Sequence, residues 1–131
     1  MDDFALSDRA DEASQLMVPP HSMEAEQSLL GGLLLENSAW DRIADFINEH
    51  DFYRYDHRLI FHNIGKLISQ AKPADVITVY EQLQASGKAE EVGGLAYLNA
   101  LAQNTPSAAN IRRYAEIVRD RGVLRQLVTI A

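Results

Sequence analysis

Residues 22–35 read SMEAEQSLLGGLLL and have the spacing of an amphipathic α-helix. The apolar side chains recur three and four residues apart, which places them on one helical face. Ser22 is a suitable N-cap, and acids in the first turn favour the positive end of the helix dipole. Gly31 and Gly32 each cost up to about 1 kcal/mol of helix stability relative to alanine. Their presence predicts that a neighbouring backbone approaches closely.

The same spacing predicts more helices further along the chain. One is expected to begin at the N-cap Ser38, and another to follow Asp56 and stop before the Lys72-Pro73 pair. Asp75 is a suitable cap for the next, which ends at Gly87. Residues 76–80 are β-branched and could form a strand, but a lone strand would have no partner in this chain. We therefore predict a helix there.

Two further helices complete the predicted fold. A short one opens at Gly93-Gly94, and a long one starts at Ser107 or Asn110 and is still periodic at Ala131, as expected of a chain that stops inside a helix. Short connections between these elements predict an all-α fold, a compact bundle of five to six short helices. The predicted core residues are Leu30, Trp40, Ile43, Ile47, Ile60, Ile64, Leu67 and Leu98.

Composition limits the class of protein. The 131 residues carry a formal net charge of −7 and contain no cysteine, which excludes a disulfide scaffold and a thiolate metal site. Such an acidic surface is unsuited to binding duplex DNA as a whole. No apolar run approaches the ~20 residues of a membrane span, and the N-terminus lacks the order of a secretory signal, so we expect a cytoplasmic protein. We expect three regions: a disordered acidic arm (1–18), a helical globular domain (19–110) and a final helix (111–131).

Catalytic motifs are not found in the sequence. The Gly87-Lys88 pair is followed by alanine and lacks the first glycine of a phosphate-binding loop. The nearest candidates for a metal site, His57 and His62, are five residues apart and off one another's helical face, so we expect no metal and no cofactor. No nucleophile motif appears. A small helical enzyme, with acids converging from several helices, stays as an alternative.

Two tyrosines and two arginines are the candidate partner contacts. Three aromatic residues within residues 52–55 cannot all face inward on a helix, so Tyr53 is a candidate surface contact. Tyr97 follows two glycines beside core leucines, and we expect it to be exposed. Arg112 and Arg113 lie in the basic C-terminal region, where acids are interleaved. An alternative function is therefore a single-stranded nucleic-acid-binding module that uses these arginines, although a base-stacking platform would need more aromatic residues.

Several segments together resemble the N-terminal domain of the bacterial replicative DNA helicase, the DnaB family. They follow the family's order and spacing over residues 19–128, and the arm before Val18 is not covered. The matching segments are Pro19–Ser22, Glu24–Ser28, Leu30–Gly32, Asp51–Tyr53, His57-Arg58, Ile60-Phe61, Pro73, Asp75, Thr78, Val92–Gly94, Ala96–Leu98, Asn104–Ile111, Tyr114-Ala115 and Ile117–Arg119.

This resemblance implies a hexameric, ATP-dependent helicase that unwinds duplex DNA at the replication fork, in the bacterial cytosol. Its C-terminal motor, which uses ATP and magnesium and contacts DNA, would be missing here. The N-terminal domain of the family is helical, self-associates into a collar and is where primase docks; a helicase loader is a further partner. The last helix would be the first arm of a truncated helical hairpin, with Ile117, Leu124 and Val128 as candidate oligomerisation residues. Tyr97→Ala is expected to weaken primase binding without unfolding the domain.

Overall fold

The computed structural model describes residues 18–130, and side chains up to residue 128. The expected disordered arm lies outside the described residues, apart from Val18. The described part is all-α, which confirms the predicted class. Its α-helices are α2 (Met23–Leu35), α3 (Tyr55–Ser69), α4 (Val76–Ala85), α5 (Gly94–Gln103) and α6 (Ile111–Ile130), joined by the 3-10 helices η1 (Asn37–Arg42), η2 (Glu49–Asp51) and η3 (Glu90–Val92).

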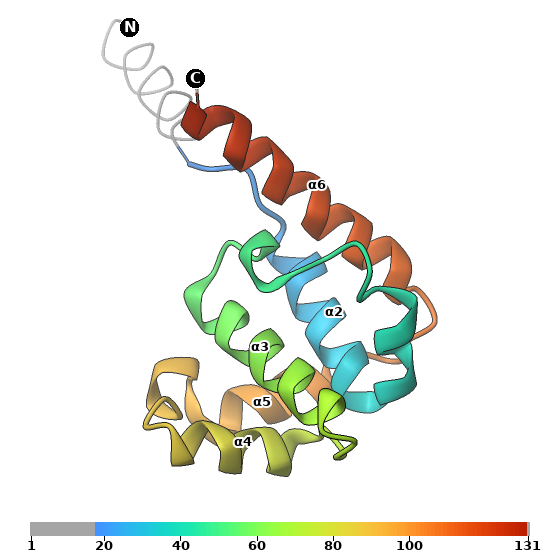
Figure 1. Ribbon diagram of the computed structural model, residues 1–131, viewed down its shortest axis with the longest axis vertical. Coiled ribbons are helices and arrows are strands. Elements are labelled where there is room, and N and C mark those ends of the chain that lie inside the picture. Colours follow the sequence, from blue (N-terminus) through green and yellow to red (C-terminus); the bar gives the residue numbers. More distant parts are fainter. Residues whose placement is uncertain (1–17, 131) are drawn as a thin grey trace, which may run out of the picture.

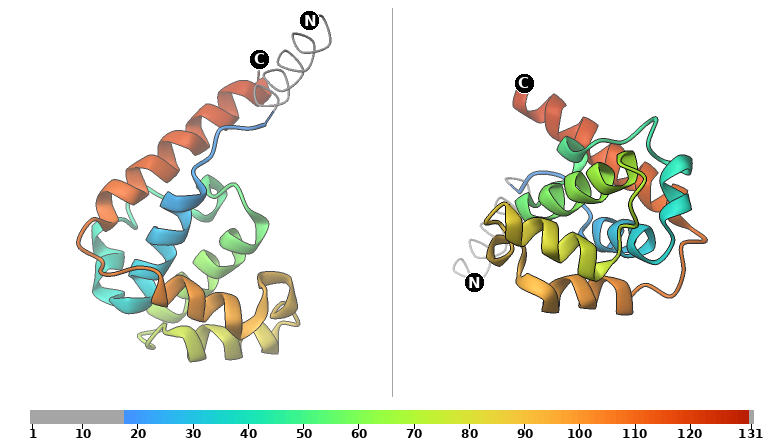
Figure 2. Two further views of the ribbon diagram at one scale, coloured as in Figure 1. Left: turned by 180° about the vertical axis from the view of Figure 1, so that it is seen from behind. Right: turned by 60° about the horizontal axis from the view of Figure 1, so that its bottom comes forward.

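Helix α2 lies at the centre of the bundle. It contacts α3, α5, α6 and η1, while α4 packs against α3 and α5 at the opposite end of the domain from the last turns of α6 (Figures 1 and 2). Helix α6 runs diagonally across α2, and its C-terminal half projects beyond the body of the domain (Figure 1). Eight of the thirteen residues in α2 are buried, which is why this helix is apolar on more than one face.

Two neighbouring segments approach α2 closely at Gly31 and Gly32. A Cβ at Gly31 would overlap the carbonyl oxygen of Leu101 and the side chain of Thr105, because α5 ends against this point. A Cβ at Gly32 would lie 3.2 Å from the Ile111 side chain, at the start of α6. The expected close approach is confirmed, and it explains why glycine is used despite its helix penalty.

The local signals for α4 and α6 are also confirmed. Asp75 accepts a hydrogen bond from the Thr78 amide (2.9 Å), and the Thr78 hydroxyl accepts one from the Asp75 amide (2.8 Å), which forms a capping box. Residues 76–80 are helical, and Gly87 follows the helix with a φ of 73°. Helix α6 begins directly after Asn110. Helix α3 begins at Tyr55, so the prediction that Asp56 precedes it was wrong by two residues.

The predicted helix over residues 38–47 was wrong. Ser38 does not cap a helix; it lies inside the 3-10 helix η1, which ends at Arg42 and is followed by a turn. The Asn37 side chain explains this, because it donates to Leu33 O (2.9 Å) and Ala74 O (2.8 Å) and accepts from the Ala74 amide (2.8 Å). These hydrogen bonds fix the start of η1 against the end of α2 and the segment before α4.

The predicted core is buried with one exception. Trp40 packs against the core but is half-buried, because η1 does not turn its indole fully inward as an α-helix would. Its ring stacks on Phe61 with the centroids 4.9 Å apart. The remaining members are at most 7% exposed: Leu30, Ile43, Ile47, Ile60, Ile64, Leu67 and Leu98.

The fold predicts a strong contrast between two isoleucines. Ile64 in α3 is fully buried, whereas Ile77 in α4 is 55% exposed. Ile64→Ala is expected to lower the free energy of unfolding by about 2–5 kcal/mol, because it removes buried methyl groups and leaves a cavity. Ile77→Ala is the matched control and should change it by no more than about 0.5 kcal/mol. Equal losses in urea unfolding would contradict the assigned core.

Candidate protein-binding site

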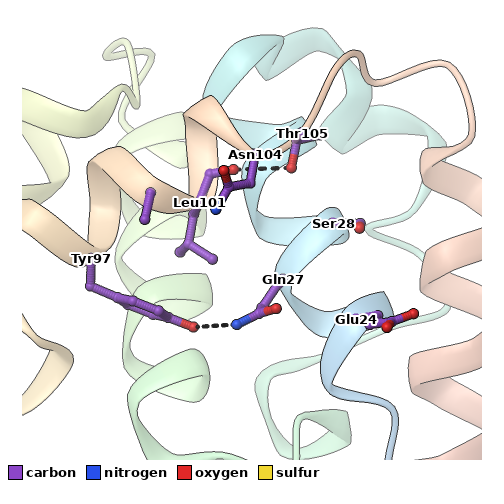
Figure 3. A pocket seen from close by; sticks show the side chains of 8 residues that line it. Glu24, Gln27, Ser28, Tyr97, Leu101, Asn104 and Thr105 are labelled. Atoms are coloured by element: carbon purple, nitrogen blue, oxygen red, sulfur yellow. Dashed lines mark hydrogen bonds between the residues drawn. The ribbon is translucent and has the colours of Figure 1, made fainter.

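A pocket between α2 and α5 is the candidate site (Figure 3). It has a volume of about 290 Å³ and opens to solvent. Glu24, Gln27 and Ser28 line it from α2, and Tyr97 lies across from Gln27, to which a hydrogen bond joins it (Figure 3). The remaining lining residues come from α5 and the segment after it: Ala100, Leu101, Asn104 and Thr105.

Tyr97 is held by a hydrogen-bond chain that runs into the core. Its hydroxyl lies 2.6 Å from His57 Nε2, and His57 Nδ1 lies 2.7 Å from Glu26 Oε1. Gln27 Nε2 donates to the Tyr97 oxygen (3.2 Å). The side chains of His57 and Glu26 are 0% and 1% exposed. This series of hydrogen bonds therefore connects α2, α3 and α5 through the buried side chains of Glu26 and His57.

The hydrogen bonds indicate which atoms of this buried cluster donate and which accept. The Glu26 carboxylate accepts from the Tyr53 amide (2.8 Å) and faces the Arg54 amide (3.5 Å), so it serves as an acceptor and the His57 Nδ1–H donates to it. When His57 Nε2 carries no proton, the Tyr97 O–H donates to it while the Tyr97 oxygen accepts from Gln27, and every group of the cluster is paired.

Burial raises the pKa of Tyr97 above its ordinary value, against the Gln27 hydrogen bond and the charge of Arg54, which lower it. The hydroxyl is therefore protonated at neutral pH and can donate as described. The Arg54 guanidinium lies 5.6 Å from the Tyr97 ring centroid and pairs with Asp56. The Asp56 hydrogen bond raises the pKa of Arg54. The Tyr97 ring therefore lies beside an ion pair, while its own hydroxyl is neutral.

The sequence-based expectation that Tyr97 is exposed was wrong. Tyr97 is half-buried and packs against the core, because its ring stacks on His57 with the centroids 5.9 Å apart. His57, considered from the sequence only as a metal-ligand candidate, is fully buried. The residues Glu26, His57 and Tyr97 are too far apart in sequence for any local pattern to join them. The one sequence signal for this cluster was the position of Glu26 on the apolar face of α2.

Tyr53 does not line this pocket. Its half-buried ring stacks on His21 (centroids 4.2 Å apart), and the Arg125 guanidinium lies 5.7 Å from it. Arg125 also donates to Pro20 O (2.8 Å) and Asp51 O (2.5 Å), which ties α6 to the N-terminal segment. Burial lowers the pKa of Arg125. Through these contacts, Tyr53 and Arg125 connect α6 with the segment before α2 and with the loop before α3.

The two predicted arginines are exposed at the start of α6. The Arg112 guanidinium lies 5.3 Å from the Phe46 ring centroid, and that of Arg119 lies 6.0 Å from the same ring. Acids at 116 and 120 alternate with them along the helix. This face has mixed charge and one aromatic ring between two arginines, which differs from the stacked aromatic platform of single-strand-binding proteins.

The projecting half of α6 has an apolar surface. Leu124 and Val128 are 44% and 63% exposed, whereas Ile117 is half-buried against the core. Val123 (44% exposed) and Leu127 (58% exposed) extend the surface and were not singled out from the sequence. Four exposed aliphatic residues within residues 123–128 are unusual for a solvated helix face. We refer to Val123, Leu124, Leu127 and Val128 as the α6 apolar surface.

Neither a metal-ligand cluster nor a membrane-spanning helix is seen in the described part. Within residues 18–130, no cluster of three or more metal-ligating side chains is present. None of the helices in that range is long and apolar enough to cross a membrane.

Comparison with known proteins identifies the family. Residues 18–120, well over half of the chain, match the model for the DnaB-like helicase N terminal domain. The chain is 50% identical over 117 residues to the replicative DNA helicase DnaB of Pasteurella multocida, and 46% identical over 119 residues to that of Haemophilus influenzae. The alignments cover 89% and 91% of this chain and 25% of each relative. The chain therefore belongs to the family of DnaB N-terminal domains.

Solved structures agree with this assignment. The N-terminal domain of DnaB helicase from Mycobacterium tuberculosis has a TM-score of 0.83 and 38% identity, over 86% of this chain and 78% of that one. A DnaB-like replicative helicase, described with its interactions with primase, shares the fold with a TM-score of 0.74 and 21% identity, over 83% of this chain and 26% of that one. The match to the curated relatives spans about a quarter of their length and is to their N-terminal domain, which is not their motor.

The buried chain of hydrogen bonds predicts the effect of Tyr97→Phe. Removal of the hydroxyl leaves His57 Nε2 buried without a donor, which is expected to lower the free energy of unfolding by about 1–3 kcal/mol. Tyr80→Phe is the control, because the Tyr80 hydroxyl accepts from Gln84 on the exposed side of α4. That change should cost less than about 0.5 kcal/mol. Equal unfolding midpoints in urea for the two variants would contradict the assigned role.

Proposed function

We propose that this chain is the non-catalytic assembly and primase-docking domain of a hexameric, ATP-dependent replicative helicase that unwinds duplex DNA at the fork in the cytoplasm. ATP and magnesium would be used, and DNA held, by the motor of the full-length protein. The family match supports this proposal, together with two separate surfaces that suit protein partners. The domain would act mechanically, by fixing the arrangement of its copies and presenting a docking surface. A helicase loader is a further proposed partner.

The α2–α5 pocket is the proposed primase site. Its lining combines a half-buried tyrosine with the exposed groups of Glu24 and Asn104, and interface anchors are commonly aromatic residues within a polar rim. The buried hydrogen bonds behind Tyr97 hold the ring in one position before a partner arrives. Such preorganisation reduces the entropy lost on binding.

The pocket is tested by Ala100→Glu in the full-length helicase. Ala100 lines the pocket and takes no part in the buried hydrogen bonds, so a larger charged side chain blocks the pocket without breaking them. We expect primase affinity, measured by calorimetry, to fall at least about tenfold, as when an interface core is disrupted. Ala85→Glu on the exposed end of α4 is the control and should bind primase normally. Unchanged affinity with a folded Ala100→Glu protein would reject the pocket as the primase site.

The α6 apolar surface is the proposed self-association surface. Exposed aliphatic residues on a projecting helix need a partner helix to remove them from water, and a second copy of the same chain supplies one by symmetry. The proposed hairpin, with Ile117, Leu124 and Val128 on its first arm, includes this surface. Ile117 faces the body of its own domain, so Leu124 and Val128 are the better candidates for contacts between copies.

Charge on this surface should prevent assembly. Leu124→Glu combined with Val128→Glu in the full-length protein is expected to shift sedimentation from hexamer to smaller species, because burying two carboxylates costs more than the interface gains. Ile77→Glu, an equally exposed aliphatic position on α4, is the control and should remain hexameric. Intact hexamers from the double variant would exclude the α6 apolar surface from assembly.

The nucleic-acid alternative is less well supported. Arg112 and Arg119 lie against Phe46, Arg125 is bound to backbone carbonyls, and acids separate the arginines along α6. Direct binding through phosphates would show a steep fall in affinity with salt and would be lost in the Arg112 and Arg113 variants.

A further inference from the structure

A groove runs along the outer face of α3, and neither proposed interface uses it. Its main part has a volume of about 730 Å³, within the range of binding sites, and an adjoining hollow of about 340 Å³ shares three lining residues with it. We call the two together the α3 groove. Its lining residues are Trp40, Ile47, Asn48, Glu49, His50, Tyr55, Arg58, Leu59, Phe61, His62, Gly65, Lys66 and Ser69.

The floor of the groove depends on Gly65. A Cβ at this position would lie 2.7 Å from Trp40 Cη2, so only glycine lets the indole lie directly across α3. The indole stacks on Phe61, and Ile47 also lines the groove. Trp40 therefore remains half-buried beside the groove instead of entering the core, which explains the exception noted in the fold.

The rim of the groove is basic in an acidic protein. Arg58 and Lys66 line it, together with His50 and His62. The one carboxylate among the lining residues, Glu49, lies 2.7 Å from His62 Nδ1, so it is paired within the groove, whereas Arg58 and Lys66 supply two positive charges. The whole chain has a formal net charge of −7. An apolar floor with a positive rim suits an acidic segment that carries large apolar side chains.

Residues 1–17 have this composition. They read MDDFALSDRADEASQLM, with five acids and one base, and the apolar residues Phe4 and Leu6 follow directly after Asp2 and Asp3. The segment joins the body close to the groove. Pro20 O and Asp51 O are both bound by Arg125, and residue 51 is next to His50 of the groove. Phe4 is 14 positions before Val18, a length of chain that spans up to about 45–50 Å.

We propose that the α3 groove binds residues 1–17 of its own chain, with Phe4 and Leu6 on the Trp40–Phe61 floor and Asp2 and Asp3 against Arg58 and Lys66. The short connection gives the segment a high effective concentration at the groove, so modest contacts suffice. The Arg112 and Arg119 face of α6 is a poorer match, because acids are interleaved along it and it offers one aromatic ring, Phe46.

Trp40 is the chain's single tryptophan and reports directly on the groove. In the full chain, Phe4→Ser with Leu6→Ser is expected to raise acrylamide quenching of Trp40 fluorescence about twofold, because the anchors carry most of the binding energy. The control, Leu16→Ser with Met17→Ser, makes the same kind of change nearer the body and should leave quenching unchanged. Equal quenching in all of these proteins would overturn the proposal.

A charge exchange tests the orientation of the segment. Lys66→Glu should raise quenching to the same extent, and adding Asp3→Lys to it should restore protection. Arg113→Glu, at an exposed arginine of α6, should have no effect. If Arg113→Glu raises quenching as much as Lys66→Glu does, the charge effect is not specific to the groove and the proposal fails. Protection that falls on dilution identifies a second copy as the occupant, which also overturns binding within one chain.

Discussion

The buried carboxylate of Glu26 is the constraint on which the arrangement of the helices depends. A charged group without access to water must be fully hydrogen-bonded, and here its partners come from the loop before α3 and from α3 itself. His57 also contacts Tyr97 in α5, so the hydrogen bonds that begin at Glu26 join three helices. Displacing any of these elements would leave a buried donor or acceptor unpaired.

Close backbone packing at Gly31 and Gly32 complements this hydrogen-bonded cluster. The glycines bring the end of α5 and the start of α6 against α2, while Gly65 lets Trp40 lie across α3. In both places glycine lowers helix stability but allows a neighbouring segment to approach closely. At Gly31 and Gly32 this packing forms the core from which α6 projects. At Gly65 it leaves the Trp40 ring at the surface of α3.

The surfaces of the domain divide by physical character. The α2–α5 pocket is polar with one preorganised aromatic ring, the α6 apolar surface is aliphatic, and the α3 groove is aromatic with a basic rim. Each character suits a different kind of partner: a folded protein, a second helix of the same kind, and an acidic segment. A small domain thus presents several surfaces of different character at once.

Local pattern was sufficient for much of this protein. Helical spacing predicted the all-α class, and capping residues such as Asp75 and breakers such as Gly87 placed α4, because these effects act within a few residues along the chain. The family resemblance also rested on sequence. The pairing of Glu26 with His57 and Tyr97, the 3-10 geometry held by Asn37, and the half-burial of Trp40 depend on residues distant in sequence. Periodicity reports which side of a helix is apolar, whereas only packing determines what that side meets.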